Sequence, residues 1–205
     1  MNIFWQTNGL NDSFLNYANA KEQSLNFAAS LQEMGAQKGD VLAILMPNCV
    51  EYPLIFSGAS KIRVTLTTIN PMYTANEIGR QLKMSNAKWA ITSEQLLPNL
   101  NTALKESNNE LTFKDRIIVL GDNPHGHISG NAMLSEKKPT GAYEVSIDVY
   151  NDICVLPYSS GTTGVPKGVM LSHHNLVANI SQASRGPPEI VSIKEATGTH
   201  KATFI

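Results

Sequence analysis

The chain of 205 residues has few cysteines, no excess of charge of either sign and no long apolar run. Its two cysteines, Cys49 and Cys154, both lie in apolar stretches, which indicates small buried side chains in a reducing compartment rather than a disulfide framework. Its 16 basic and 17 acidic residues nearly balance. Because no basic stripe or polybasic cluster stands out, the composition argues against nucleic acid and anionic lipid as partners.

Membrane and secretion signals are also missing. No apolar run is long enough to span a bilayer, and residues 1–10 lack the charged start and apolar centre of a signal peptide. We therefore expect a soluble intracellular protein without a transmembrane segment. The sequence leaves open whether its compartment is the cytoplasm or the peroxisome. A peroxisomal tripeptide is expected to lie on a C-terminal part beyond this chain, and the final Phe204-Ile205 offers none.

Helical and strand patterns alternate along most of the chain. Thr74 and Glu77, for example, have the spacing of a capping box that opens a helix. Apolar periodicity predicts helices at residues 13–34, 51–60, 74–84, 93–107 and 172–183, and strands at 41–46, 64–69, 88–92, 116–120 and 153–158. Residues 121–149 are polar and predict a long surface excursion. This alternation predicts an α/β fold, a doubly wound and mostly parallel sheet flanked by helices.

The segment from Ser159 to Gly168 is the most informative part of the sequence. It contains three glycines, four hydroxyl side chains, one proline and one lysine, and apolar runs flank it on both sides. Glycine allows close approach of backbone N–H groups to an anion, hydroxyls add donors and lysine adds a positive charge, so the segment suits a polyphosphate. A flexible hairpin connection is the ordinary alternative for such a composition.

The spacing excludes two common nucleotide loops. Counting from Gly161, Pro166 occupies the place of the second glycine of a Walker A loop, and no Gly-x-Gly-x-x-Gly run is present. Pro166 also lacks an N–H and fixes its own φ, which favours a turn over the start of a helix. The segment is therefore predicted to form a strand, a glycine-rich turn and a second strand.

Four segments resemble the AMP-forming adenylating superfamily, which includes acyl-CoA synthetases, 4-coumarate–CoA ligases, luciferases and peptide-synthetase adenylation domains. In the order of the family, they are residues 38–48, 69–74, 159–168 and 171–176. The resemblance runs roughly from Phe14 to Ala183 and is strongest to the 4-coumarate–CoA ligase and luciferase-like branch. It implies that residues 1–205 are an incomplete large N-terminal domain, without the later large-domain segments and without the small C-terminal domain that carries a catalytic lysine.

The resemblance also implies a chemistry and a site. Enzymes of this superfamily activate a carboxylic acid, here of the 4-coumarate or fatty acid type, with ATP to acyl-AMP, and then transfer it to coenzyme A. Lys167 is expected to stabilise phosphate charge as the catalytic residue. The residues expected to bind the β- and γ-phosphates are Ser159, Ser160, Gly161, Thr162, Thr163, Gly164 and Lys167. Mg²⁺ is implied as well, with no metal ligand assigned within this chain.

Two alternatives stay open from the sequence. The chain is either part of an acid–CoA ligase that is inactive by itself, or a non-catalytic short form that binds a nucleotide or a full-length partner subunit. An unfinished sheet would also leave an edge through which the chain could associate with itself. The acid that is activated cannot be identified.

Several other residues favour structural roles. His125 and His127 are expected in a surface loop rather than at a metal, and His173 is expected in the first turn of a helix that Ser172 caps. Trp89 is expected to pack in the core. Arg63 stands where the family usually turns on a small residue or glycine, which makes the local packing there uncertain.

Overall fold

The computed structural model describes residues 4–7, 14–138, 145–159 and 166–185. Its main sheet has seven strands in the order β11-β8-β4-β3-β5-β6-β7. All neighbouring pairs in this sheet are parallel except β11 with β8. The predicted mostly parallel α/β sheet is therefore confirmed.

The elements follow the predicted alternation closely. The strands of the main sheet are β3 (Val41–Leu45), β4 (Thr65–Ile69), β5 (Trp89–Ser93), β6 (Ile117–Leu120), β7 (Ile128–Ser129), β8 (Ile153–Val155) and β11 (Leu171–Ser172). The helices are α1 (Tyr17–Glu33), α2 (Tyr52–Lys61), α3 (Ala75–Met84), α4 (Leu97–Glu106), α5 (Gly130–Ser135) and α6 (His173–Arg185), with a 3₁₀ turn at Glu94–Leu96. The other strands are β1 (Phe4–Thr7), β2 (Phe14–Asn16), β9 (Tyr158–Ser159) and β10 (Lys167–Gly168).

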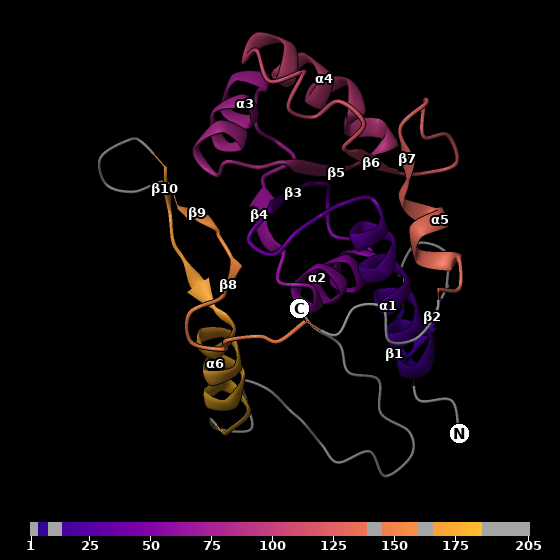
Figure 1. Ribbon diagram of the computed structural model, residues 1–205, viewed down its shortest axis with the longest axis vertical. Coiled ribbons are helices and arrows are strands. Elements are labelled where there is room, and N and C mark those ends of the chain that lie inside the picture. The colour runs from indigo at the N-terminus through magenta and orange to yellow at the C-terminus, as the bar shows by residue number, and fades with distance from the viewer. Residues whose placement is uncertain (1–3, 8–13, 139–144, 160–165, 186–205) are drawn as a thin grey trace.

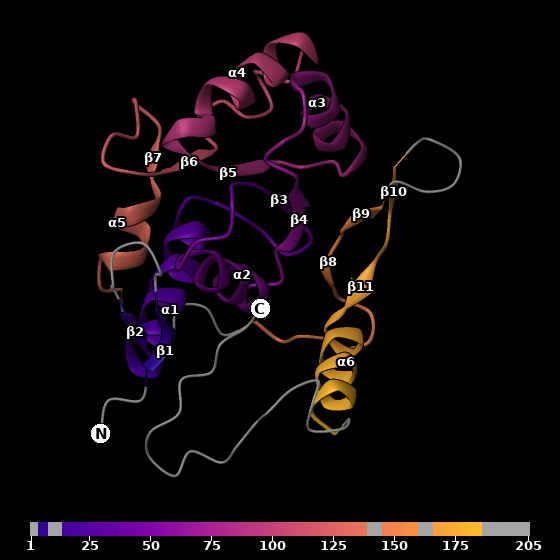
Figure 2. The same cartoon turned by 180° about the vertical axis from the view of Figure 1, so that it is seen from behind.

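Helices cover both faces of the parallel strands, as the doubly wound arrangement requires. Figures 1 and 2 show α3 and α4 on one side of β3 to β6 and α1, α2 and α5 on the other. The buried side chains form two clusters that match these layers, one around Phe27 and Ile44 and the other around Ile78 and Phe113. Strands buried on both faces explain the continuous apolar run in β3.

Local predictions at helix starts are largely confirmed. Thr74 and Glu77 form the capping box, with the Thr74 N–H donating to Glu77 Oε2 at 2.8 Å. The first helix, however, begins at Tyr17 rather than near residue 13, because Phe14–Asn16 pair with β1 and the Asn16 side chain caps the helix. The pairing of Phe14–Asn16 with residues 4–7 was not predicted, because no local sequence pattern indicated it.

The prediction of a surface excursion over residues 121–149 is wrong for its central part. Residues 128–135 form β7 and α5, and Met133 and Leu134 are buried in the core cluster beside α1. The Asn26 side chain donates to the Leu134 carbonyl oxygen at 3.1 Å and accepts from the Lys138 N–H at 3.2 Å. This long-range pairing with an amide inside α1 helps to hold the segment in which Met133 and Leu134 are buried.

We predict that Gly58→Ala in α2 lowers the free energy of unfolding by about 1–3 kcal/mol. A Cβ atom at this position would lie 2.5 Å from the Ser24 carbonyl oxygen of α1, a backbone atom that cannot rotate away. Urea denaturation measures the change. Ser57→Ala is the matched control because Ser57 is exposed on the same helix; an equal effect of both substitutions would contradict close α1–α2 packing as the cause.

Candidate functional site

The predicted loop extends from the carboxyl end of β8, a strand that joins the parallel sheet through β4. The Leu156 N–H donates to the Leu66 carbonyl oxygen at 2.7 Å. The Thr65 and Thr67 hydroxyls each donate to a main-chain carbonyl oxygen, of Ile153 and Leu156 respectively, at 2.9 Å. Ligands of open α/β sheets bind at the carboxyl ends of the strands, so the loop lies at the edge where a ligand is expected.

The predicted single strand over residues 153–158 is divided in two. Pro157 lacks an N–H and interrupts the ladder, so β8 ends at Val155 and β9 begins at Tyr158. β9 then pairs antiparallel with β10, with Ser159 opposite Lys167 and Tyr158 opposite Gly168. This confirms that the two predicted strands form a hairpin, which we call the β9–β10 hairpin.

Two of the predicted phosphate-binding residues lie at the end of this hairpin. Ser159 and Lys167 are exposed and face each other as register partners across its two strands. The other five, Ser160, Gly161, Thr162, Thr163 and Gly164, lie outside the described residues. A hydroxyl donor and an ammonium group at the two ends of one glycine-rich connection are the donor types that a phosphate accepts.

Gly168 allows the two strands of the hairpin to approach each other closely. A Cβ atom at Gly168 would lie 3.0 Å from Cζ of the Tyr158 ring and 3.3 Å from Leu156 Cδ1. Burial raises the pKa of the Tyr158 hydroxyl. A small cavity of about 20 Å³ beside the hairpin joins it to α3, and its lining residues are Tyr73, Glu77, Arg80, Gln81, Met84, Tyr158 and Pro166.

The second leg of the hairpin returns through β11 into α6. The Ser172 hydroxyl accepts from the Asn175 N–H at 3.4 Å, and Asn175 Oδ1 accepts from the Ser172 N–H at 2.9 Å. The predicted cap at Ser172 is therefore confirmed, with Asn175 in the reciprocal position. His173 follows as the first residue of α6, which fits the expected structural position. Burial, together with the Arg63 charge, lowers the pKa of its imidazole, while Asp152 opposes that shift.

An ion-pair cluster that sequence reasoning missed lies at the foot of the hairpin. Asp152, directly before β8, contacts Arg63 at 2.5 Å and Lys38 at 3.1 Å, and its carboxylate also accepts from the Asp148 N–H at 2.7 Å. Burial by itself would raise the pKa of Asp152, but these partners lower it below its ordinary value. The only hint of this cluster in the sequence was Arg63, at a turn where the family usually has a small residue or glycine. Its partner Asp152 is distant in the sequence.

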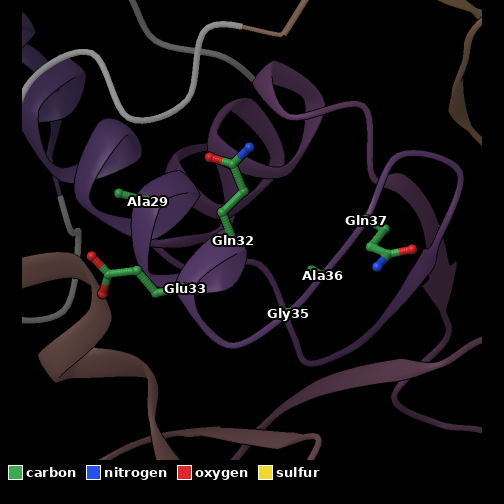
Figure 3. Close-up of a pocket in the computed structure, with 6 residues that line it drawn as sticks. All are labelled: Ala29, Gln32, Glu33, Gly35, Ala36 and Gln37. Atoms are coloured by element: carbon green, nitrogen blue, oxygen red, sulfur yellow. The ribbon is translucent and has the colours of Figure 1, made fainter.

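Another cavity, of about 430 Å³, lies at the carboxyl end of α1. Figure 3 shows its lining residues, which are Ala29, Gln32, Glu33, Gly35, Ala36 and Gln37. Neither Ser159 nor Lys167 lines it. Glu33, its one carboxylate, pairs with Lys138 at 2.8 Å. We assign no chemistry to this cavity.

The remaining residues singled out in the sequence occupy structural positions. His125 is exposed and lies 3.5 Å from Glu94, and no group of three metal-ligating side chains occurs among the described residues. Trp89 is buried, as predicted. Cys154 is buried as predicted, whereas Cys49 is only half-buried beside Met46, and both thiols are free. Within the described ranges, no helix is both long and apolar enough for a bilayer crossing.

Comparisons with known proteins cover most of the chain. The family model described as AMP-binding enzyme matches residues 7–197, a wider range than the predicted resemblance. The chain is 37% identical over 181 residues to 4-coumarate-CoA ligase 1 of Narcissus pseudonarcissus, covering 87% of this chain and 31% of that protein. It therefore spans about a third of that relative's length.

Solved structures show the same fold. A red emitting luciferase from Phrixothrix hirtus superposes with a TM-score of 0.76 at 24% identity, covering 89% of this chain and 35% of that one. An anthranilate CoA ligase in complex with anthranoyl-AMP superposes with a TM-score of 0.69 at 26% identity, covering 80% of this chain and 30% of that one.

We predict that Gly168→Ala displaces the Tyr158 ring towards solvent, which lowers the pKa of that hydroxyl towards 10, the ordinary tyrosine value. NMR titration of protein labelled at the tyrosine Cζ atoms measures this shift. Val169→Ala is the matched control, because Val169 is the neighbouring residue and is exposed. An unchanged Tyr158 titration in Gly168→Ala would show that the ring does not lie against the Gly168 backbone.

Proposed function

We propose, from the premise that the chain belongs to the AMP-binding enzyme family, that it is the ATP-phosphate-binding part of an AMP-forming acid–CoA ligase. The observation that carries this proposal is the β9–β10 hairpin at the carboxyl end of β8, with Ser159 opposite Lys167. Because the chain spans only about a third of the relative's length, the activity of a complete enzyme is part of the proposal and not of the observation.

The chemistry of the hairpin supports a role at the β- and γ-phosphates of ATP. When the carboxylic acid attacks the α-phosphate, the departing pyrophosphate gains negative charge, and donors placed around it stabilise that charge. Lys167 is exposed and has no acidic neighbour within ion-pair distance among the described residues, so its ammonium group is free for such a contact. We propose that Ser160, Gly161, Thr162, Thr163 and Gly164 complete the binding loop.

The donor set of this hairpin fits phosphate rather than a metal. Hydroxyl and ammonium groups donate to phosphate oxygens, whereas Mg²⁺ prefers carboxylate and phosphate oxygens as ligands. We propose that Mg²⁺ accompanies ATP as its phosphate-bound ion and that this hairpin supplies no carboxylate ligand to it. Bound in that way, the ion would neutralise charge on the phosphates.

For the acid substrate we propose a chemical class, and for the compartment two alternatives. Relatives named as 4-coumarate-CoA ligases favour an aromatic or fatty carboxylic acid, with coenzyme A as the acceptor. The cytoplasm and the peroxisome are both compatible with the observed residues. We further propose that the 205-residue chain by itself does not complete acyl-CoA synthesis, because the family resemblance assigns the catalytic lysine to a later domain.

Self-association has one specific structural support. The edge strands β11 and β7 have two residues each, so they offer little backbone for pairing with another sheet. Met170 beside β11 and Val177 and Ile180 on α6 are, in contrast, 64–70% exposed. We propose that any self-association uses these apolar side chains, and light scattering of Val177→Lys against the unchanged chain tests it.

We predict that Lys167→Ala weakens binding of MgATP about 10- to 100-fold, the factor expected for the loss of one charge-assisted hydrogen bond. In the complete enzyme, the same substitution should lower acyl-AMP formation by roughly two to three orders of magnitude. Isothermal titration measures the affinity, and ATP–pyrophosphate exchange with 4-coumarate and fatty acids measures the first step.

The control for this prediction is Lys105→Ala, since Lys105 is exposed on α4, a helix that lies farther from the hairpin than α3 does (Figure 1). Unchanged MgATP affinity in Lys167→Ala, or an equal loss in both variants, would refute the assigned role of Lys167. Formation of a CoA thioester by the purified 205-residue chain would refute the proposal that it is inactive by itself.

A further inference from the structure

Arg63 holds an unfavourable backbone conformation in the turn between α2 and β4. Its φ is 62°, in the left-handed region that glycine and asparagine tolerate and that a long side chain seldom adopts. The turn is nevertheless well bonded, because the Arg63 carbonyl oxygen accepts from the Gly39 N–H at 2.9 Å. Such strain persists only where surrounding contacts hold it in place.

The side chain of Arg63 supplies such a contact. Its guanidinium lies 2.5 Å from Asp152, and both side chains are only 11% exposed. The Nε atom of Arg63 is buried and has no partner among the described residues. A charge this far removed from water depends on its ion pair, because the desolvation cost of a buried guanidinium must be compensated.

This ion pair lies at the base of the two strands that flank the β9–β10 hairpin in the chain. Asp152 immediately precedes β8, which leads into β9, and His173 immediately follows β11, which comes after β10. The Arg63 and Asp152 charges both act on His173, whose Nε2 is buried and has no partner among the residues described. Because β11 pairs with β8, the ion pair at the start of β8 also affects the position of β11.

We propose that Arg63 is a positioning residue that anchors the start of β8 beside β4, and through the β8–β11 pairing also β11, and so holds Ser159 and Lys167 of the β9–β10 hairpin in place for the phosphates of ATP. This inference rests on the proposed function for its ligand, but the anchoring itself does not depend on it. Arg63 touches none of the predicted phosphate-binding residues in the described part of the chain, and it acts through Asp152.

The sheet offers a matched control ion pair. Lys88 lies 2.6 Å from Asp40, which is likewise buried and also accepts from the Gln37 N–H at 3.0 Å. This pair joins β3 and β5 and does not involve the hairpin. Lys88→Gln thus removes an ion pair of similar length, with a more exposed cation (48% against 11%), without removing a hairpin contact.

The test compares Arg63→Asn, Asp152→Asn, the double variant and Lys88→Gln by hydrogen exchange. Asparagine tolerates the left-handed backbone, so Arg63→Asn removes the ion pair without adding strain. The Leu156 amide donates to Leu66 of β4, and the Val169 amide donates to Pro157 across the hairpin. We expect both amides to exchange about tenfold faster in Arg63→Asn and in Asp152→Asn. The Ile44 and Ile91 amides of the central strands should be unchanged, which separates anchoring from a general loss of stability.

Two further readouts sharpen the test. Arg63→Asn should raise the pKa of His173 and Asp152→Asn should lower it, because the two charges act on that imidazole with opposite sign. Lys38 is also paired with Asp152 and keeps its charge in both variants. NMR titration of the histidine resonances measures both. The double variant should be no worse than Asp152→Asn, because that substitution already removes the Arg63–Asp152 pair.

MgATP titration provides the functional arm, with an expected loss of about tenfold in affinity for Arg63→Asn and none for Lys88→Gln. Unchanged exchange at Leu156 and Val169, or equal exchange in Lys88→Gln, overturns the anchoring role. Faster exchange with unchanged affinity overturns its connection to ATP. If the unchanged chain does not bind MgATP, the proposed function fails in this chain, while the exchange measurements still decide the anchoring.

Discussion

The pairing of β8 with β4 is the constraint on which the candidate site depends. These strands share only one register pair, Leu66 with Val155, so ladder hydrogen bonds alone give a short junction. The hydroxyls of Thr65 and Thr67 extend it by donating to main-chain carbonyl oxygens on the β8 side. Because the hairpin begins directly after this junction, its position is set by β4 rather than by its own residues.

A chain of hydrogen bonds connects this junction to the helix layer behind it. Gln81 of α3 is buried and donates from Nε2 to the Thr67 hydroxyl at 3.1 Å and to the Thr68 carbonyl oxygen at 2.9 Å. Thr67 thus accepts from a helix and donates to the segment that leads into the hairpin. Buried polar groups that are satisfied on both sides in this way fix a single arrangement, since any shift leaves one of them unpaired.

Local patterns account for most of the elements that the sequence predicted correctly. The apolar run of β3, the capping box at Thr74 and the cap at Ser172 each involve residues close in the chain, so their physical chemistry is visible in the sequence. The wrong predictions concern long-range pairing. Residues 128–135 lie within a stretch that is polar as a whole, but they pack against α1 through Met133 and Leu134, and Asn26, more than a hundred residues earlier, bonds to that segment.

The sequence by itself determined the order of most helices and strands, the family resemblance and the donor types of Ser159 and Lys167, because composition and short spacing fix these features locally. Only the tertiary structure decided that the predicted strand over residues 153–158 divides at Pro157, that Ser159 faces Lys167, and that Arg63 meets Asp152. Arg63 and Asp152 lie far apart in the chain, and no local periodicity encodes their contact. It exists because the parallel order of β4 and β8 brings the two turns that precede these strands to the same edge of the sheet.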